Sequence, residues 1–387
     1  MTSDISLDPL RTGPARTFAP IVDQHATWIA VNPIQGCPKG CAYCFLRDRG
    51  QAPARPALMA DPGQTADLLT ASAYYAPDRP VALYTWTDVM ASADSRAHLA
   101  GLLGELARRR TPNPIVLITK CRVPDDSIQA VITARRSGMC VIVYLSYSGL
   151  GSEVERGIRH EEVRANFPRL ADAAIPVVHY WRPAFPESAT PEVMECVLAL
   201  AARYARCSMA AGLKVEPAAL ARLERIWPAL AATSGVTEAE GVYPRPFWEF
   251  THKTRQRYPE YPVFHANSCA LAYVLGQPDS YGMFGSDLCR NRNRCPEPQR
   301  DRCGAASQAS PALTESLVRA ALRRRGHADA EFTVDAAARV VVIDAALPSN
   351  AAAALTQDLK AAIISGRMSR DPYWNSGTSG ALPLVIG

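Results

Sequence analysis

Three cysteines stand within eight residues near the start of the chain, in the run Cys37-Pro-Lys-Gly-Cys41-Ala-Tyr-Cys44. Three thiolates on one short loop can bind three corners of a [4Fe–4S] cube. They leave the fourth iron open, and an open position is what separates catalytic from structural metal sites. Gly36 and Gly40 let the backbone wrap closely around such a group. The spacing therefore predicts an iron–sulfur cluster that can bind a further ligand.

Two plainer interpretations compete with the cluster, namely a zinc site or three unrelated cysteines. Zinc loops usually pair a C-x2-C step with a second pair of ligands, and no tidy second pair follows in this sequence. The loop comes directly after a predicted strand, and an aromatic residue precedes the last cysteine. This context favours the cluster.

A second group of cysteines lies far along the chain, at Cys269, Cys289, Cys295 and Cys303. Their spacings are wide and match no zinc-finger pattern. Four thiols near prolines and a glycine are compatible with an auxiliary [4Fe–4S] cluster. Zinc and purely structural cysteines are the alternatives. Cysteines that stand singly are expected to pack as small apolar residues; they are Cys121, Cys140, Cys196 and Cys207.

Five arginines accompany the second cysteine group, at Arg290, Arg292, Arg294, Arg300 and Arg302. Arginine binds phosphate or carboxylate groups through two hydrogen bonds at once. These side chains can contact an anionic substrate, neutralise an anionic cluster or simply face solvent. Solvation is the default for each of them taken alone.

Short apolar runs alternate with amphipathic segments over the first half of the chain. Near-continuous apolar strands separated by helices indicate parallel strands joined by helical crossovers. The expected strands are 27–31, 81–86, 115–119, 141–146, 177–181 and 209–215. The expected helices are 95–110, 125–137, 160–174 and 192–206. Six strand–helix units predict a partial (β/α)6 barrel of the TIM type, whose site lies at the carboxyl ends of the strands.

The rest of the chain is expected to add smaller parts to this barrel. We divide the sequence into an extended arm (1–27), the barrel with a helical extension (28–262), an irregular cysteine- and arginine-rich extension (263–304) and a small α+β tail (305–387). The tail is expected to contain a helix at 311–325, a hairpin of 331–334 with 340–344, and a helix at 349–365.

Composition narrows the class of protein. The chain has 387 residues, 48% of them hydrophobic, and a net charge of +5. A full core is feasible, and the modest charge permits a polyanionic partner without arguing for one. No apolar run approaches the roughly 18 residues of a membrane span, and the N-terminus lacks a secretory signal pattern. We therefore expect a cytoplasmic protein without membrane contact.

The cysteine motif resembles the signature of radical S-adenosylmethionine (SAM) enzymes, C-x3-C-x2-C with an aromatic residue before the third cysteine. Here that aromatic residue is Tyr43. The resemblance implies a partial barrel, SAM bound to the open iron, and a 5′-deoxyadenosyl radical that abstracts a hydrogen atom. It also implies that a flavodoxin- or ferredoxin-type reductase supplies the electron.

The ends of the next strands resemble the subgroup of spore photoproduct lyase and related "DNA repair photolyase" proteins. In that subgroup, Ser-Asp, Thr-Lys and Ser at these strand ends contact SAM. The matching residues here are Thr87, Asp88, Lys120 and Ser146. A lysine suits the carboxylate of SAM, and oxygen-bearing side chains suit its ammonium and ribose groups. The resemblance also places Tyr43 near the adenine and covers residues 28–215.

One departure from the subgroup concerns hydrogen donation. Spore photoproduct lyase carries a cysteine just before its Thr-Ser-Asp run, where this chain has Thr85. We therefore do not expect repair of the spore photoproduct. Cys121 follows Lys120 and is a candidate hydrogen donor, with burial as a small apolar residue as the alternative. Arg182 follows the fifth strand and is a candidate contact for SAM or substrate.

Several weaker candidates lie near the same strands. His179, on an apolar strand, is expected to be a core histidine with its hydrogen bonds satisfied. Glu155 and His160 lie in a charged loop after the fourth strand. The loop is a candidate cover for the site, with a solvated helix start as the favoured alternative. Trp248 and Phe250 are expected to be aromatic core residues.

These observations predict a radical SAM enzyme acting on a small metabolite or a peptide. The first alternative is a nucleic-acid repair or modification enzyme of the photolyase-like subgroup. The second is a non-catalytic protein that binds an iron–sulfur cluster or zinc and docks a partner through its tail. Fold resemblance alone is a weak guide to substrate.

Overall fold

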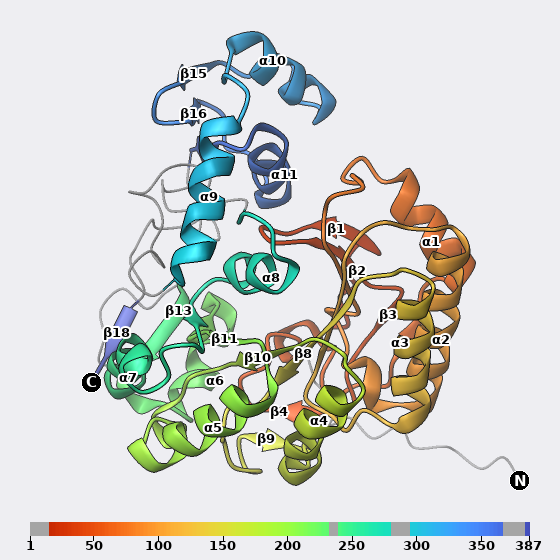
Figure 1. The fold of residues 1–387 in the computed structure, drawn as a ribbon, viewed down its shortest axis with the longest axis vertical. Helices are drawn as coiled ribbons and strands as arrows, with labels where there is room; N and C mark the ends of the chain where they lie inside the picture. The colour runs from red at the N-terminus through yellow and green to blue at the C-terminus, as the bar shows by residue number, and fades with distance from the viewer. Residues whose placement is uncertain (1–14, 232–238, 280–294, 367–383) are drawn as a thin grey trace, which may run out of the picture.

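The computed structural model describes residues 15–231, 239–279, 295–366 and 384–387. Its centre is an eight-stranded sheet in the order β1-β2-β6-β7-β8-β10-β11-β14 (Figure 1). β1 pairs antiparallel with β2, and every later neighbour is parallel. The bounds are β1 Val22–Gln24, β2 Ile29–Val31, β6 Val81–Leu83, β7 Ile115–Thr119, β8 Val141–Ser146, β10 Val177–Trp181, β11 Cys207–Ala210 and β14 Val263–Phe264. The α/β class predicted from the sequence is confirmed.

Alternate residues of each strand enter two different hydrophobic cores. Val81 and Leu83 pack toward the outer helices, whereas Ala82 between them belongs to the inner core. Val141 and Val143 likewise face outward while Ile142 faces inward. Because both faces are covered, the strands are apolar at almost every position, as parallel strands in α/β proteins are.

Helices follow the strands and cover the outer face of the sheet (Figure 1). Four of them were expected from apolar periodicity and lie within about two residues of the predicted bounds. The side chain of Ser92 caps the start of α2, and that of Thr190 caps the start of α5. The bounds are α1 Pro62–Ala71, α2 Ala93–Arg108, α3 Asp125–Arg136, α4 His160–Asp172 and α5 Pro191–Tyr204.

The sixth predicted strand, 209–215, is wrong in extent. The parallel strand β11 ends at Ala210, and β12 (Leu213–Val215) belongs to a separate sheet with β13 (Ala239–Pro244) and β18 (Leu384–Ile386). Gly212 permits this break, because a Cβ there would meet the backbone oxygen of Val242 at 2.5 Å. The sequence also gave no sign of β14, a seventh parallel strand of two residues. α6 (Leu220–Glu224) and α7 (Arg245–Arg257) lie between these pieces.

The described residues of the cysteine-rich segment are largely helical, where the sequence predicted irregular structure. α8 (Asn267–Leu275) packs against β10, β11 and β14 and completes the inner core. α9 (Glu297–Ala309) crosses the boundary that we expected at residue 304 and leads toward the C-terminal part (Figure 1). The sequence analysis took the prolines of this segment as signs of a loop. Pro298 instead lies in the first turn of α9, where proline is compatible with a helix.

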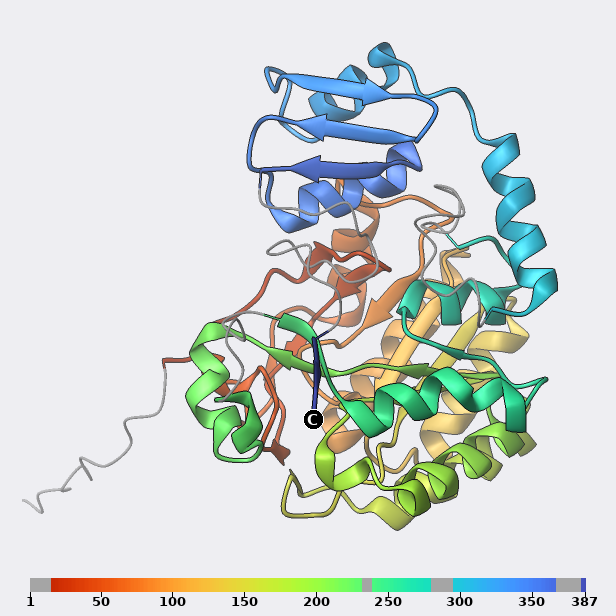
Figure 2. The same ribbon diagram turned by 90° about the vertical axis from the view of Figure 1, so that its left-hand side faces the viewer.

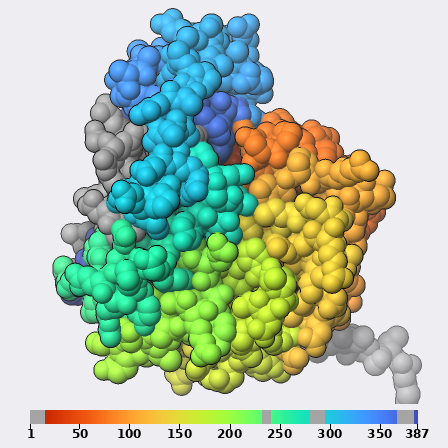
Figure 3. Space-filling view, in the orientation of Figure 1, coloured from red at the N-terminus to blue at the C-terminus, as the bar shows by residue number. Residues whose placement is uncertain are grey.

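The C-terminal part forms a small unit with its own hydrophobic core (Figure 2). It contains α10 (Glu315–Arg324), β15 (Phe332–Asp335), β16 (Val340–Ile343), α11 (Ser349–Leu359) and β17 (Ala362–Ser365). The hairpin of β15 and β16 was predicted correctly. The helix expected over 349–365 ends at Leu359, because Lys360 adopts a left-handed conformation and β17 pairs parallel with β16. In the space-filling view this unit is a separate lobe beside the barrel (Figure 3).

A buried ion-pair group joins this lobe to the barrel. Asp358 of α11 pairs with Arg79, which precedes β6, and with Arg325 at 2.7 Å. The two arginine side chains are each 7% exposed and the aspartate is 12% exposed. Asn350 also donates to Asp23 of β1 at 3.0 Å. The lobe is therefore fixed against the β1 edge of the sheet.

Two further expectations concern single features of the barrel. His179 is fully buried, and its ring nitrogens lie 2.8 Å from the hydroxyl of Ser208 and from the carbonyl oxygen of Tyr147. Burial lowers the pKa of His179 to about 4. It is a core histidine whose hydrogen bonds are satisfied, as predicted.

Among the described residues, no helix is both long and apolar enough to cross a membrane.

We predict that Asp358→Asn lowers the free energy of unfolding by about 3–5 kcal/mol, because two buried arginines lose their counter-charge. Urea unfolding measures the change. Asp344→Asn is the matched control, since Asp344 is an exposed carboxylate of the same lobe. A D358N chain that unfolds at the same urea concentration as D344N would show that the ion-pair group does not hold the lobe.

Candidate active site at the carboxyl ends of the strands

A cavity of about 1170 Å³ opens at the carboxyl ends of the parallel strands. Its wall brings together three predicted cluster ligands and six predicted cofactor-binding residues. They are Cys37, Cys41, Cys44, Tyr43, Thr87, Asp88, Lys120, Ser146 and Arg182. They come from the loop after β2 and from the ends of four different strands, so the fold gathers residues that are far apart in sequence.

The cysteine loop is held by backbone contacts on both sides. Gly36, with a φ of +101°, makes the turn into the loop, and a Cβ there would meet the oxygen of Arg55 at 2.9 Å. The amide of Cys37 donates to the oxygen of Gln51 at 2.8 Å. Further along, β4 (Gly40–Cys41) pairs antiparallel with β9 (Glu155–Arg156), which places Glu155 directly opposite Cys41.

All three thiols of the loop are at least partly buried, and their pKa values are raised. Burial raises the pKa of Cys37 to about 12, and Asp88 adds to the rise. Burial also raises the pKa of Cys41 to about 12, with Lys120 acting in the opposite direction. Burial raises the pKa of Cys44 as well. Deprotonated thiols in this place require a compensating positive centre, which a metal cluster supplies because ligand thiols bind as thiolates.

The described residues contain no group of three His, Cys, Asp or Glu side chains arranged to hold one metal ion. A cubane differs from a single ion in this respect. Each of its thiolate ligands binds a different iron atom, so the three sulfurs need not converge on one point. The donor set of three thiols on one cavity wall fits such a cluster.

Glu155 organises the wall beside Cys41. Its carboxylate, which is 1% exposed, pairs with the ammonium of Lys120 at 2.7 Å and accepts a hydrogen bond from the Tyr43 hydroxyl. The Lys120 ammonium also lies 5.6 Å from the centre of the Tyr43 ring. His160 approaches the other carboxylate oxygen at 3.7 Å. Lys120, Tyr43 and His160 thus all approach the one buried carboxylate of Glu155.

The sequence did not identify Glu155 as a site residue, and its expected solvation is wrong. The charged run around it is typical of an exposed helix start, and its neighbours Glu153 and Arg156 are indeed exposed. Only the pairing of β9 with β4 buries this one side chain. Nothing in the local sequence marks that pairing.

Thr87 and Asp88 tie the strand ends together. The Thr87 hydroxyl donates to the oxygen of Gly36 at 2.6 Å. The Asp88 carboxylate accepts bonds from the Thr119 hydroxyl and the Lys120 amide, both at 2.7 Å, and from the Met90 amide at 3.1 Å. A carboxylate has about four acceptor positions. Asp88 therefore keeps about one acceptor position for a ligand.

Arg182 provides both a carbonyl oxygen and a guanidinium to the site. The carbonyl accepts from the Lys120 ammonium at 3.0 Å and from the Ser146 hydroxyl at 3.3 Å. The guanidinium donates to the Tyr180 hydroxyl at 2.8 Å and lines the cavity. The end of β10 is thereby fixed to the ends of β7 and β8.

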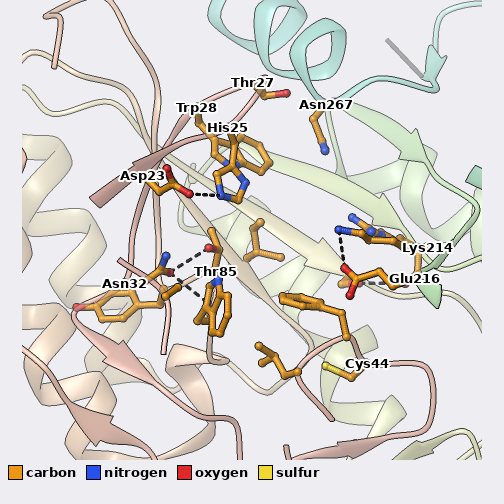
Figure 4. Close-up of a pocket in the computed structure, with 18 of the residues that line it drawn as sticks. Asp23, His25, Thr27, Trp28, Asn32, Cys44, Thr85, Lys214, Glu216 and Asn267 are labelled. Carbon is orange, nitrogen blue, oxygen red and sulfur yellow. Dashed lines mark hydrogen bonds and ion pairs between the residues drawn. The ribbon is translucent and has the colours of Figure 1, made fainter. Parts of the chain in front are cut away.

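The two positions considered for hydrogen donation differ in placement. Thr85 lines the cavity and donates to Asn32 at 3.0 Å (Figure 4). Cys121 belongs to the core between the sheet and the outer helices and is not part of the cavity lining. Burial strongly raises the pKa of Cys121, and Asp88 adds to the rise. Its position matches the alternative of a small buried residue.

The far wall of the cavity comes from other parts of the chain. Asp23 and His25 of the β1 region approach each other at 3.9 Å, and Lys214 pairs with Glu216 at 3.0 Å (Figure 4). Asn267, at the start of α8, points toward the same space (Figure 4). The C-terminal lobe adds residues of α11 and β17, including Thr356 and Ile363. The lobe thus forms part of the cavity wall.

The second cysteine group is only partly described. Cys269 and Cys295 are buried in the same inner core. The Cys303 sulfur accepts bonds from the Asp279 amide at 3.3 Å and from Gln299 at 3.6 Å. Cys289 lies outside the described residues, as do Arg290, Arg292 and Arg294. Arg300 and Arg302 contact the oxygens of Cys295 and Gln299, respectively.

Comparison with known proteins finds no matching family model and no matching curated protein. Among solved structures, the chain resembles a spore photoproduct lyase complexed with a dinucleoside spore photoproduct, at a TM-score of 0.46 and 14% identity, over 61% of this chain and 75% of that one. It also resembles SuiB of Streptococcus suis bound to SAM, with a TM-score of 0.42, 11% identity and coverage of 61% and 48%.

A third similar structure is the radical SAM methyltransferase TsrM of Kitasatospora setae. The TM-score is 0.36 at 18% identity, over 48% of this chain and 34% of that one. The chain therefore spans about half of SuiB and a third of TsrM. Likenesses this distant assign no activity to the chain.

We predict that Glu155→Gln lowers the free energy of unfolding by about 1–3 kcal/mol, because Lys120 loses a buried, charge-assisted hydrogen bond. Chemical denaturation measures the difference. The matched control is Glu153→Gln, which removes the same charge from an exposed position two residues away and should change stability by less than about 0.5 kcal/mol. Equal stability of the two variants would contradict the role given to Glu155.

Proposed function

We propose that the chain is a radical SAM enzyme. The observation that supports this most is the shared cavity wall: the three cysteines of the C-x3-C-x2-C motif lie on it together with Lys120, Ser146 and Arg182. Strand-end polar residues beside a metal-binding loop are the arrangement that barrel enzymes use for catalysis. A purely structural metal site would not need these polar residues around it.

Cys37, Cys41 and Cys44 would hold a [4Fe–4S] cluster, and SAM would occupy the adjoining space. When bound and reduced, the cluster with SAM supplies a 5′-deoxyadenosyl radical that removes a hydrogen atom from a substrate. Lys120 would bind the SAM carboxylate. Its ammonium has three N–H donors, and two of them are directed at oxygens of its own chain at 2.7 and 3.0 Å. Ser146, Thr87 and Asp88 would offer oxygens, and Tyr43 would lie near the adenine.

The cavity also has room for a substrate. Pockets for one drug-sized ligand measure about 300–1000 Å³, whereas this cavity measures about 1170 Å³. The C-terminal lobe and the β1 region contribute to its far wall, beyond the SAM-binding residues. We propose a small metabolite or a peptide segment as the substrate, because a walled cavity admits such molecules more readily than a duplex.

A nucleic-acid substrate is the alternative that the strand-end motifs and the basic residues near the second cysteine group favour. The non-catalytic alternative leaves Lys120, Ser146 and Arg182 without a role in the cavity. Arg182 and Lys214 nevertheless give the wall positive charges that an anionic substrate of either kind can use.

A second [4Fe–4S] cluster on Cys269, Cys289, Cys295 and Cys303 remains part of the proposal. Its support is the clustering of the four thiols in sequence and the burial of Cys269 and Cys295 in one core. The iron content of a chain that lacks the first three cysteines decides the matter. About four irons in that chain indicate a second cluster, and none indicates structural cysteines.

We predict that Cys37→Ala abolishes the formation of 5′-deoxyadenosine from SAM under dithionite, since one corner of the cluster loses its ligand. The product is measured by liquid chromatography after anaerobic reconstitution. Cys196→Ala is the matched control, because Cys196 is exposed on α5 and far from the motif in sequence. Equal product from both variants would refute the assignment of Cys37.

We predict that deuterium from a labelled metabolite or peptide appears in 5′-deoxyadenosine, because the radical takes hydrogen directly from the substrate. Mass spectrometry of the product, with candidate compounds tested one at a time, measures the transfer. A parallel reaction with unlabelled substrate gives the background from which the transfer is counted. If only DNA or RNA supports transfer, the metabolite or peptide proposal is wrong and the nucleic-acid alternative replaces it.

A further inference from the structure

The loop that carries the cysteines has a second face, which lies outside the main cavity. Gly40 and Ala42 line a pocket of about 310 Å³ together with Ile226 and four arginines. The arginines are Arg47, Arg156, Arg222 and Arg225. We call this feature the arginine pocket. Among the residues that the structure describes, no carboxylate lines it.

The arginine pocket and the main cavity share one stretch of backbone as a common wall. Along this stretch Gly40 and Ala42 line the arginine pocket, whereas Cys41 and Tyr43 line the main cavity. Gly40 and Cys41 form the strand β4, in which successive residues face opposite sides, and Ala42 and Tyr43 follow it directly. Residues next to each other in sequence therefore line the wall of the proposed cluster site and the wall of the arginine pocket.

Two of the arginines are fastened to that wall. Arg222 donates to the carbonyl oxygens of Ala42 and Cys44, and it pairs with Asp48. Arg47 donates to the oxygen of Gly40 at 3.4 Å. Asp48 offsets only one of the four charges. The backbone that holds the cysteines is thus bound directly to cationic groups on its outer face.

The other two arginines are exposed to solvent. Arg156 lies directly opposite Gly40 in the pairing of β9 with β4, and Arg225 follows α6. The pocket therefore presents a net positive charge to the outside. In Figures 1 and 2, β4, β9 and α6 lie at the opposite end of the molecule from the C-terminal lobe.

We propose that the arginine pocket docks an acidic protein that donates one electron. The inference rests on the proposed function, because only a redox centre on Cys37, Cys41 and Cys44 gives such a donor a target. SAM and substrate would fill the main cavity, so a protein partner reaches the cysteine loop most directly from its outer face. One electron leaves the donor's flavin or iron–sulfur centre and enters the cluster, and no bond forms and no proton moves.

Charge is what selects this partner. Clustered positive charge attracts an acidic protein and steers its encounter, and the effect falls with rising salt. Redox partners meet through small, transient interfaces, for which four arginines around a shallow pocket suffice. A donor with a basic surface would be repelled.

The test uses Arg156→Gln/Arg225→Gln in the full chain, because both side chains are exposed and neither lines the main cavity. Binding to a flavodoxin, and separately to a ferredoxin, is measured by isothermal titration in about 10 mM salt, where screening is weak. We expect the dissociation constant for the donor to rise about tenfold. Arg136→Gln/Arg324→Gln removes two exposed arginines elsewhere and should leave binding unchanged.

A second readout separates docking from chemistry. Dithionite is a small reductant that needs no docking site, so dithionite-driven formation of 5′-deoxyadenosine should be equal in the R156Q/R225Q variant and wild type. Failure of wild type in that assay contradicts the proposed function, whereas donor binding is measured independently of it.

Three outcomes would overturn the docking proposal. The first is that neither donor binds wild type, and the second is that both double variants bind the donor equally well. The third is that R156Q/R225Q loses affinity for a single-stranded DNA oligonucleotide while donor binding stays the same. The arginine pocket would then be a nucleic-acid contact.

Discussion

The pairing of two short strands, β4 and β9, is the constraint on which the site depends. It places Cys41 opposite Glu155 and so joins the cysteine loop to the segment after β8. Glu155 in turn holds Lys120 from β7 and Tyr43 from the loop itself. A buried carboxylate is costly unless it is paired and hydrogen-bonded. The position of each of these groups therefore fixes the positions of the others.

The barrel contributes strand ends, and the outlying parts of the chain enclose them. Parallel strands end at one edge of the sheet, so residues from β6, β7, β8 and β10 meet there although they are far apart in sequence. The C-terminal lobe covers part of the same space, held by the ion-pair group around Asp358. Enclosure of this kind excludes water and strengthens electrostatic interactions inside a site. The radical chemistry that we propose for this site would require such protection.

Much of the fold could be predicted from the sequence because the strands are buried on both faces. Apolar runs such as 141–146 have no other plausible structure when helices flank them. β14 could not be predicted, since two residues carry no periodicity. The end of α11 was missed for a related reason: the residues after Lys360 continue an apolar, alanine-rich pattern, and only pairing with β16 makes them a strand.

The candidate site likewise contains residues that a local sequence pattern predicted and residues that it did not. Cys37, Cys41, Cys44, Lys120 and Ser146 were predicted from spacing and from strand ends, and the structure brings them to one cavity. Glu155 and the arginine pocket were not predicted, because both arise from contacts between segments that are distant in sequence. Asp88 was predicted as a ligand-binding residue, and its sequence position did not reveal that its carboxylate also accepts bonds from Thr119 and Lys120.

The most direct test of the central claim is the electron paramagnetic resonance spectrum of the reduced chain, recorded with and without SAM after anaerobic reconstitution with iron and sulfide. A cluster held by three cysteines has an open iron to which SAM binds. The account predicts a [4Fe–4S] signal that changes when SAM is added. A chain that assembles no cluster, or a signal that SAM leaves unaltered, would contradict it.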